Sequence, residues 1–348
     1  MSNSAHSRRY GVAVIGCGGM GIRHVEAVAG HPRADLVAVV DWKEEVRERC
    51  QRDYGAQNAY ADYTAIMNRD DVQLVVVATW PSTHREITEA CLRAGKDVLC
   101  EKPLAPTLEE ASSMIDTARE TGRKLRVGYI LHYNRAYNKV TEMIHEGALG
   151  PPPYIMRLLG GEHAAAPEHW RRDLKLIVET SPGIDCGCHY VDIMRRVTGA
   201  EAVWVSGVGA RTESETPSDN FDYELFSVKF DDGSSGIYEV GWTHQYRNFS
   251  EKEFVGPAGR IRLTYAHERP DGYQEEGDQI EYYQYPGKLT IINVPTGFKR
   301  VGEELTDLID TVEQDKDVTE HLEAAYKSLQ IVLAGHQSAV EGRTIWLQ

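Results

Sequence analysis

The stretch Tyr10-Gly11-Val12-Ala13-Val14-Ile15-Gly16-Cys17-Gly18-Gly19-Met20-Gly21 decides the fold of this 348-residue chain. An apolar run rich in β-branched residues leads directly into G-x-G-x-x-G, and a helix-like segment follows. Farther along, a second apolar run over residues 36–40 ends in Asp41. A glycine fingerprint between a strand and a helix, with an acidic residue about 20 positions later, is typical of a dinucleotide-binding site.

Each residue of this fingerprint has a physical task. Gly16 permits a tight turn, Gly18 lets a pyrophosphate approach the backbone, and Gly21 allows close packing of helix on strand. Backbone amides at the helix start favour the phosphate charge. Asp41 can accept a hydrogen bond from a ribose 2′-hydroxyl and would repel a 2′-phosphate, so we predict NAD rather than NADP. Lys43 leaves room for NADP, and a glycine-rich turn without a ligand is the structural alternative.

Composition restricts the class of protein. A chain of this length predicts two domains. The net charge of −15 argues against nucleic acid or an anionic membrane as the main partner. The six cysteines are too scattered for a disulfide scaffold, which favours reduced thiols and a cytoplasmic location. No apolar run approaches the length needed to cross a bilayer.

The pattern of apolar and polar residues changes near residue 130. Before it, strand-like apolar runs alternate with helical segments, a pattern that predicts a parallel sheet covered on both faces. After it, alternating β-rich segments predict a mostly antiparallel sheet with helices on one face. We therefore expect an α/β fold with an NAD-binding Rossmann domain over 1–130 and a substrate-binding and oligomerisation domain over 131–348. Asp231-Asp232-Gly233 is a plausible hairpin turn in the second domain.

Two further segments carry residues suited to catalysis. Lys102, in Glu101-Lys102-Pro103, lies where a Rossmann strand ends, and its ammonium could face a substrate oxygen. If the region is helical, Asp185 and His189 lie on one helix face, where the carboxylate could orient an imidazole that exchanges protons near neutral pH. The alternatives are a surface lysine, an aspartate that caps a helix and a buried structural histidine. Cys186, Cys188 and His189 lack a fourth ligand for zinc, and we predict no metal site.

The ordered set of motifs resembles the Gfo/Idh/MocA oxidoreductase family over nearly the whole chain. The set comprises Gly16-x-Gly18-x-x-Gly21, Asp41, Thr79-Trp80-Pro81-Ser82-Thr83-His84, Glu101-Lys102-Pro103 and Asp185-x-x-x-His189. The resemblance implies a Rossmann domain, a C-terminal domain with a large open sheet, a homodimer or homotetramer, and a Lys–Pro bond that is often cis. It also implies that Lys102, Asp185 and His189 form the catalytic set.

Two departures from the family pattern affect the substrate site. Ser181-Pro182-Gly183 stands where a glycine cluster usually precedes the aspartate, and His132 stands where an arginine is usual. The predicted cofactor contacts are Gly16, Gly18, Gly19, Met20, Gly21, Asp41, Trp42, Thr79, Trp80, His84, Glu101 and Lys102. The predicted substrate contacts are His132, Tyr133, Arg135, His163, Trp170, Arg171, Arg172 and His244. A solvated loop is the alternative for 162–172, where the arginine pair would otherwise suit an anionic substrate group.

Three functions fit these residues. The leading hypothesis is an NAD-dependent dehydrogenase for a secondary hydroxyl of a sugar, sugar derivative or cyclitol, with His189 as proton acceptor and Lys102 stabilising the substrate oxygen. The second is a redox-neutral enzyme that cleaves glycosides through transient oxidation by tightly bound NAD. It needs an additional acid or base, for which His132, Tyr133, Glu162 and His163 are candidates. The third is a non-enzymatic dinucleotide sensor.

Overall fold

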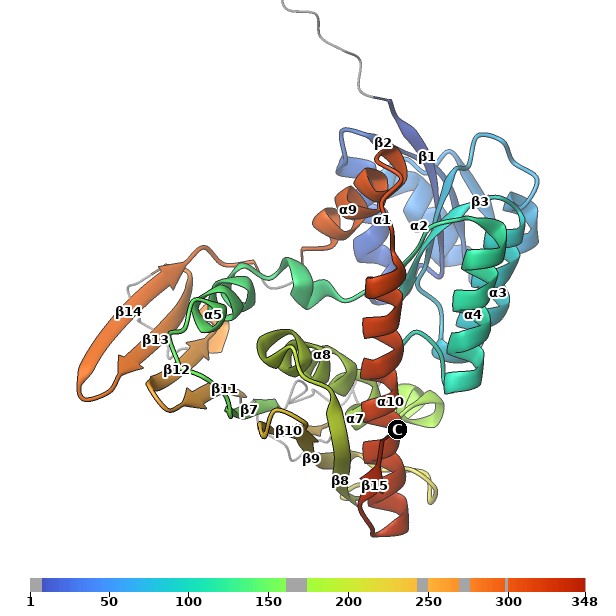
Figure 1. Ribbon diagram of the computed structural model, residues 1–348. Coiled ribbons are helices and arrows are strands. Elements are labelled where there is room, and N and C mark those ends of the chain that lie inside the picture. Colours follow the sequence, from blue (N-terminus) through green and yellow to red (C-terminus); the bar gives the residue numbers. More distant parts are fainter. Residues whose placement is uncertain (1–7, 161–173, 243–249, 269–275, 298–299, 348) are drawn as a thin grey trace, which may run out of the picture. The chain divides into compact units, whose positions relative to one another are not determined.

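The computed structural model describes residues 8–160, 174–242, 250–268, 276–297 and 300–347 (Figure 1). The chain forms two compact units. The first comprises Met1–Tyr129 and Arg300–Tyr326, and the second comprises Ile130–Lys299 and Lys327–Gln348. None of the helices within the described ranges is both long enough and apolar enough to cross a membrane.

The first unit contains a six-stranded parallel sheet of order β3-β2-β1-β4-β5-β6. This is the strand order of a dinucleotide-binding Rossmann fold, as the alternating pattern predicts. The apolar runs are buried because helices cover both faces of such a sheet. The strands are β1 (Tyr10–Ile15), β2 (Ala34–Val40), β3 (Asn58–Tyr60), β4 (Leu74–Val77), β5 (Asp97–Glu101) and β6 (Leu125–Gly128).

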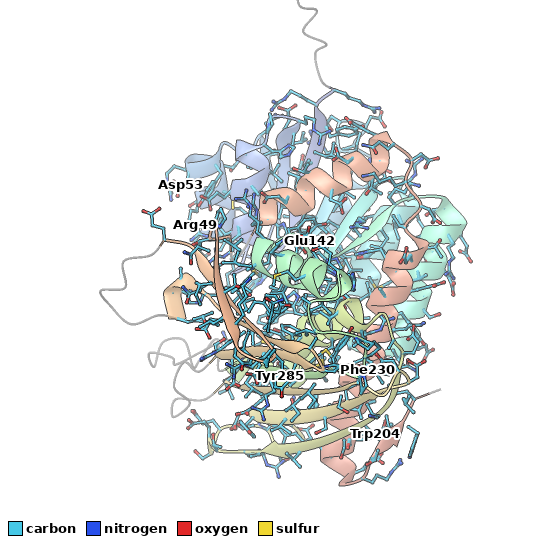
Figure 2. All side chains as sticks on the ribbon, turned by 60° about the vertical axis from the view of Figure 1, so that its left-hand side comes forward. Arg49, Asp53, Glu142, Trp204, Phe230 and Tyr285 are labelled. Carbon is cyan, nitrogen blue, oxygen red and sulfur yellow. The ribbon has the colours of Figure 1, made fainter. Side chains whose placement is uncertain are left out.

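Helix α4 shows how local signals set the ends of a helix in this unit. In α4 (Leu108–Thr121), the Thr107 side chain accepts a hydrogen bond from the Glu110 N–H, and left-handed Gly122 ends the helix. Figure 2 shows Arg49 and Asp53 projecting from α2, whose Cys50 is fully buried. The remaining segments are α1 (Gly21–Gly30), α2 (Glu44–Tyr54), α3 (Pro81–Arg93) and the short 3₁₀ helix η1 (Tyr63–Ile66).

The C-terminal part of the chain corrects the predicted domain boundary. The change near residue 130 agrees with the structure, but 131–348 does not form one unit, because residues 300–326 belong to the first. Helix α9 (Val301–Glu313) places Leu305, Leu308 and Ile309 in the same apolar cluster as Val14 and Val25. The chain returns because this apolar helix face is buried against the Rossmann core.

The second unit contains a nine-stranded sheet of order β14-β13-β12-β11-β7-β10-β9-β8-β15. Its described pairs are antiparallel except for β7 with β10, so the prediction of a mostly antiparallel sheet is confirmed. The strands are β7 (Ile155–Gly160), β8 (Ala202–Ala210), β9 (Tyr223–Phe230), β10 (Ser235–Gly241), β11 (Ser250–Gly256), β12 (Gly259–Thr264), β13 (Asp278–Gln284), β14 (Lys288–Val294) and β15 (Ile345–Trp346).

Side chains on this sheet alternate between a buried and a more open face. In β7, Met156 and Leu158 are fully buried, whereas Ile155 is 55% exposed. The helices of this unit are α5 (Arg135–His145), a helix over 174–179, α7 (Pro182–Asp185), α8 (Gly187–Thr198) and the later part of α10 (Thr319–Glu341), with short 3₁₀ helices η2 (Ile130–Tyr133) and η3 (Ala266–Glu268).

Two local features of this sheet test the sequence patterns. The predicted hairpin turn is confirmed between β9 and β10, where Gly233 has a φ of 90°. Strand β7, in contrast, was not predicted, although it is central to the sheet. It follows Pro151-Pro152-Pro153, which indicated only a turn, and its six residues are too short to decide between strand and loop.

Leu308→Ala tests whether α9 is part of the Rossmann core. Leu308 is fully buried, so we expect the free energy of unfolding of the first unit to fall by about 2–5 kcal/mol. Urea denaturation measures the change, with Val178→Ala as control because Val178 is 67% exposed on the helix over 174–179. Equal stability of the two variants would contradict the assignment of α9 to this core.

Candidate functional site

The glycine turn has the geometry that its spacing predicts. Gly16 has a φ of +82°, and a Cβ on it would lie 2.6 Å from the Ala78 carbonyl oxygen. A Cβ on Gly21 would lie 1.7 Å from the Gly16 carbonyl oxygen. Apart from the adjoining backbone, no atom of the described residues lies within 4 Å of the positions that a Cβ would take on Gly18 and Gly19. The predicted tight turn and close helix packing are therefore confirmed, and the backbone at Gly18 and Gly19 is open to a ligand.

Asp41 is fixed beside this turn by two backbone amides. The Cys17 N–H donates to Oδ2 and the Lys43 N–H donates to Oδ1, each at 2.9 Å. The neighbouring Trp42 side chain is 76% exposed, and the Lys43 ammonium lies 5.1 Å from its ring centroid. An anchored carboxylate, an exposed aromatic ring and an open glycine backbone fit the ribose, the base and the pyrophosphate of a dinucleotide.

The segment after β4 combines an exposed and a buried side chain. Trp80 is 41% exposed, as a cofactor contact requires. His84 is 1% exposed, and its ring nitrogens lie 2.9 Å from the Pro103 carbonyl oxygen and 3.3 Å from that of Thr79. Burial lowers the pKa of His84. These contacts favour a supporting role for His84 over the direct cofactor contact expected from the sequence.

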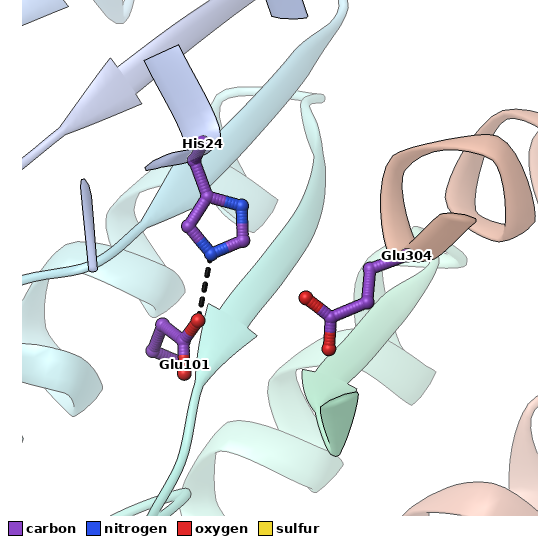
Figure 3. A group of neighbouring side chains, drawn as sticks. All are labelled: His24, Glu101 and Glu304. Carbon is purple, nitrogen blue, oxygen red and sulfur yellow. Dashed lines mark hydrogen bonds and ion pairs between the residues drawn. The ribbon is translucent and has the colours of Figure 1, made fainter. Parts of the chain in front are cut away.

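Lys102 directly follows β5 and is only partly buried. The Lys102–Pro103 peptide bond is cis, as the family resemblance implies. Glu101 is 4% exposed, and its Oε1 lies 2.6 Å from Nε2 of His24 on α1 (Figure 3). The Lys102 N–H donates to the other carboxylate oxygen at 3.2 Å. Glu101 therefore holds the backbone of Lys102 through a hydrogen bond. Its burial argues against the direct cofactor contact expected from the sequence.

Asp185 and His189 lie on two successive helices. Ser181 caps α7 by accepting a hydrogen bond from the Ile184 N–H, and α7 ends at Asp185. The two residues thus do not share one regular helix, and the alternative that Asp185 caps a helix is wrong, because Ser181 is the cap of α7. Cys186, between the helices, keeps right-handed helical angles. Asp185 is buried and His189 is half-buried at the start of α8.

A buried carboxylate that the sequence patterns did not reveal supports α7. Glu224 on β9 is fully buried, and its Oε2 accepts a hydrogen bond from the Gly183 N–H at 2.8 Å. Its Oε1 lies 2.7 Å from Nδ1 of His336 on α10. A Cβ on Gly183 would lie 2.5 Å from the same Oε2. Glycine is therefore required at this position of the unusual Ser181-Pro182-Gly183 segment.

His132, the departure from the family arginine, lies within hydrogen-bond distance of a carboxylate on α8. Its Nε2 lies 2.6 Å from Oδ2 of Asp192, whose side chain is 2% exposed. The sequence analysis did not select Asp192, although its position three residues after His189 was a usable signal. Tyr133 is half-buried and Arg135 is exposed at the start of α5. The other predicted substrate contacts lie outside the described residues: His163, Trp170, Arg171, Arg172 and His244.

One group of side chains in the described part of the chain could offer three metal-ligand atoms. It consists of His24, Glu101 and Glu304, and these atoms lie within 4.8 Å of one another. Sequence spacing could not reveal it, because the three residues come from α1, β5 and α9.

Comparison with protein families gives matches to two consecutive models. Residues 10–129 match the model described as "Oxidoreductase family, NAD-binding Rossmann fold", and residues 137–262 match "GFO/IDH/MocA C-terminal domain". The first match covers the glycine turn, Asp41 and Lys102, and the second covers Asp185 and His189.

The chain is also similar over most of its length to proteins named as inositol dehydrogenases. It is 29% identical to scyllo-inositol 2-dehydrogenase (NAD(+)) of Bacillus subtilis, over 72% of each chain. It is 30% identical to inositol 2-dehydrogenase of Klebsiella pneumoniae, over 72% of this chain and 73% of that one. The crystal structure of myo-inositol 2-dehydrogenase from Lactobacillus plantarum has the same fold, with a TM-score of 0.83 at 21% identity, covering 98% of this chain and 100% of the other.

Asp41→Asn tests the cofactor preference. Removing the negative charge should weaken NAD binding and strengthen NADP binding, because the carboxylate no longer repels a 2′-phosphate. Calorimetric titration with each cofactor measures both affinities, and we expect their ratio to shift by at least about tenfold, equivalent to 1.4 kcal/mol. Asp53→Asn, which changes an exposed residue of α2, is the control. An unchanged ratio would contradict the role of Asp41.

Proposed function

Because this chain belongs to the GFO/IDH/MocA oxidoreductase family, we propose that it oxidises a secondary hydroxyl of a cyclitol, sugar or sugar derivative. Membership confirms the predicted oxidoreductase class and NAD as the cofactor. The observation that carries the substrate class is the similarity, over 72% of the chain, to proteins named as inositol 2-dehydrogenases. The retained Lys102, Asp185 and His189 support it.

NAD would supply the hydride acceptor for this oxidation. The open backbone at Gly18 and Gly19 would hold the pyrophosphate, with help from the amides at the start of α1. The anchored Asp41 carboxylate would accept hydrogen bonds from the ribose, and the exposed Trp42 would pack against the base.

His189 is the general base in this proposal. A half-buried imidazole at the start of a helix can accept the proton of the substrate hydroxyl near neutral pH. Asp185, buried at the end of α7, would orient it. The Lys102 ammonium would stabilise negative charge that develops on the substrate oxygen, an interaction that is stronger in the transition state than in the ground state.

The pairing of His132 with Asp192 favours one second candidate. The redox-neutral cleavage of a glycoside needs an acid–base group beyond His189, and a histidine held by a buried carboxylate has that character. In this alternative, NAD stays bound and the hydride is returned at each turnover, so no NADH accumulates.

A panel of inositols, sugars and glycosides, with and without added NAD, distinguishes the two reactions. We expect NADH to form in a 1:1 ratio with oxidised cyclitol or sugar, measured by nicotinamide absorbance beside product analysis. Glycoside cleavage without NADH accumulation would instead support the second reaction. Turnover of neither class by the folded, NAD-binding protein would contradict both proposals.

Lys102→Met and His189→Asn test the catalytic assignment once a substrate is known. Each change should lower kcat by about 10²–10⁴-fold, because it removes charge stabilisation or proton transfer. The dissociation constant for NAD should change far less than kcat, and calorimetric titration measures it. Lys139→Met, on the partly exposed side of α5, is the matched control. Loss of NAD binding rather than of turnover in a folded Lys102→Met protein would contradict the assigned role.

The open face of the nine-stranded sheet is our candidate for a homodimer or homotetramer contact. It carries apolar side chains that water would otherwise surround. Ile155 is 55% exposed on β7, Val208 is 60% exposed on β8, and Ile291 is 44% exposed on β14.

Ile155→Lys tests this assembly. The native protein should have two or four times the 39.0 kDa chain mass by light scattering after size exclusion, and the variant should shift toward a single chain. Val178→Lys is the control, since Val178 is 67% exposed on the helix over 174–179, outside the sheet. A monomeric native protein, or a shift in both variants alike, would contradict the proposed contact.

A further inference from the structure

Three buried ionisable side chains lie together at the end of β5, next to Lys102 in the sequence. His24 comes from α1, Glu101 from β5 and Glu304 from α9, and they are 1%, 4% and 1% exposed. Figure 3 shows the Glu304 carboxyl facing the hydrogen-bonded pair of His24 and Glu101. This group of three residues is called the buried triad below.

The two carboxyl groups of the buried triad have very different partners. Glu101 accepts hydrogen bonds from His24 and from the Lys102 N–H. Burial alone would raise the pKa of Glu101, but the His24 hydrogen bond and charge outweigh it, so that the pKa is lowered. Both carboxyl oxygens of Glu304 are buried without a hydrogen-bond partner in the described structure. An ionised carboxylate in that position would be strongly destabilising, and protonation removes the charge.

The charged groups around Glu304 favour its neutral form. Burial is the largest influence, and the Glu101 carboxylate adds repulsion; together they raise the pKa of Glu304 well above its ordinary value. Arg126 on β6 acts in the opposite direction, but its guanidinium is paired with Asp307, which also raises that pKa.

We propose that Glu304 is a proton-carrying positioning residue, which keeps the His24–Glu101 pair, and through it the backbone of Lys102, in place. The neutral carboxyl lies beside the hydrogen-bonded pair without repelling the Glu101 carboxylate. An ionised Glu304 would repel it and would disturb the strand end. The consequence for catalysis rests on the role of Lys102 in the proposed function, whereas the proton on Glu304 does not.

The geometry favours a proton over a metal ion in the buried triad. His24 Nε2 and Glu101 Oε1 are 2.6 Å apart and hydrogen-bonded to one another. Two ligand atoms at about 2.0–2.2 Å from one tetrahedral ion would lie more than 3 Å apart. Metal coordination would therefore require this hydrogen bond to break.

Glu304→Gln keeps the size of the side chain and stays neutral at every pH. For a raised folded-state pKa, the stabilisation is full below the unfolded pKa and is lost as pH rises toward the folded one. Relative to the variant, the native protein should therefore lose stability from about pH 4.5 upward, by up to roughly tenfold per pH unit in the unfolding equilibrium constant. Equilibrium urea denaturation at a series of pH values measures this divergence. Glu26→Gln, an exposed change on α1, is the control. Above about pH 6 its free energy of unfolding should change with pH in parallel with that of the native protein.

Infrared spectroscopy observes the proton directly and needs no substrate. The native protein near neutral pH should show the carbonyl band of a protonated carboxylic acid, and Glu304→Gln should lack it. If the variant does not fold, a pH titration of this band in the native protein decides the question. Absence of the band, or parallel stability curves for the native protein and Glu304→Gln, would overturn the proposal. So would a stoichiometric divalent metal, found by elemental analysis in the native protein and absent from the variant.

Turnover adds the link to Lys102. With an established substrate, the native enzyme should lose kcat at high pH as Glu304 ionises, and Glu304→Gln should keep its activity there. If kcat of both proteins falls in the same way at high pH, the positioning role is overturned. If no substrate is turned over at all, the proposed function fails, while the infrared band and the stability curves still decide the state of Glu304.

Discussion

The close approach of Gly21 to the carbonyl oxygen of Gly16 positions helix α1, and the nucleotide-binding edge depends on it. Helix α1 begins where a Cβ would lie 1.7 Å from the carbonyl oxygen of Gly16, so any side chain would push the helix away from β1. With glycine there, the first amides of α1 and the open backbone at Gly18 share one edge of the sheet. The same turn brings the Cys17 N–H to Asp41, which fixes the carboxylate that we propose selects the cofactor.

The second unit uses a similar constraint around α7 and α8. A Cβ on Gly183 would meet Glu224, and one on Gly187 would lie 2.9 Å from the Tyr238 ring, so both helices can pack tightly on the sheet only with glycine at these positions. The buried Glu224 accepts a hydrogen bond from the Gly183 N–H and is itself hydrogen-bonded to His336. Asp185 and His189 are thus carried on helices whose positions are set by packing and by buried hydrogen bonds.

The predictions from sequence were most accurate where the signal is local. Helices α4 and α8 both end at a left-handed glycine, Gly122 and Gly199, and such a glycine after a helical run is a local sequence signal. Strand β7 was missed because its partners β10 and β11 come much later in the chain. The domain assignment of α9 was wrong for a related reason: an amphipathic helix shows that it has a buried face, but not which core buries it.

The sequence by itself determined the Rossmann fold and the cofactor class, since both depend on residue types at short, fixed spacings. The residues proposed for catalysis came from the resemblance of the ordered motifs to the family. Only the tertiary structure decided which buried groups support them. Glu101 with His24 and Glu304, Glu224 with His336, and His132 with Asp192 are pairs and clusters formed by elements far apart in the chain. Burial and hydrogen bonding between such elements set charge and protonation, and these properties arise only when the chain has folded.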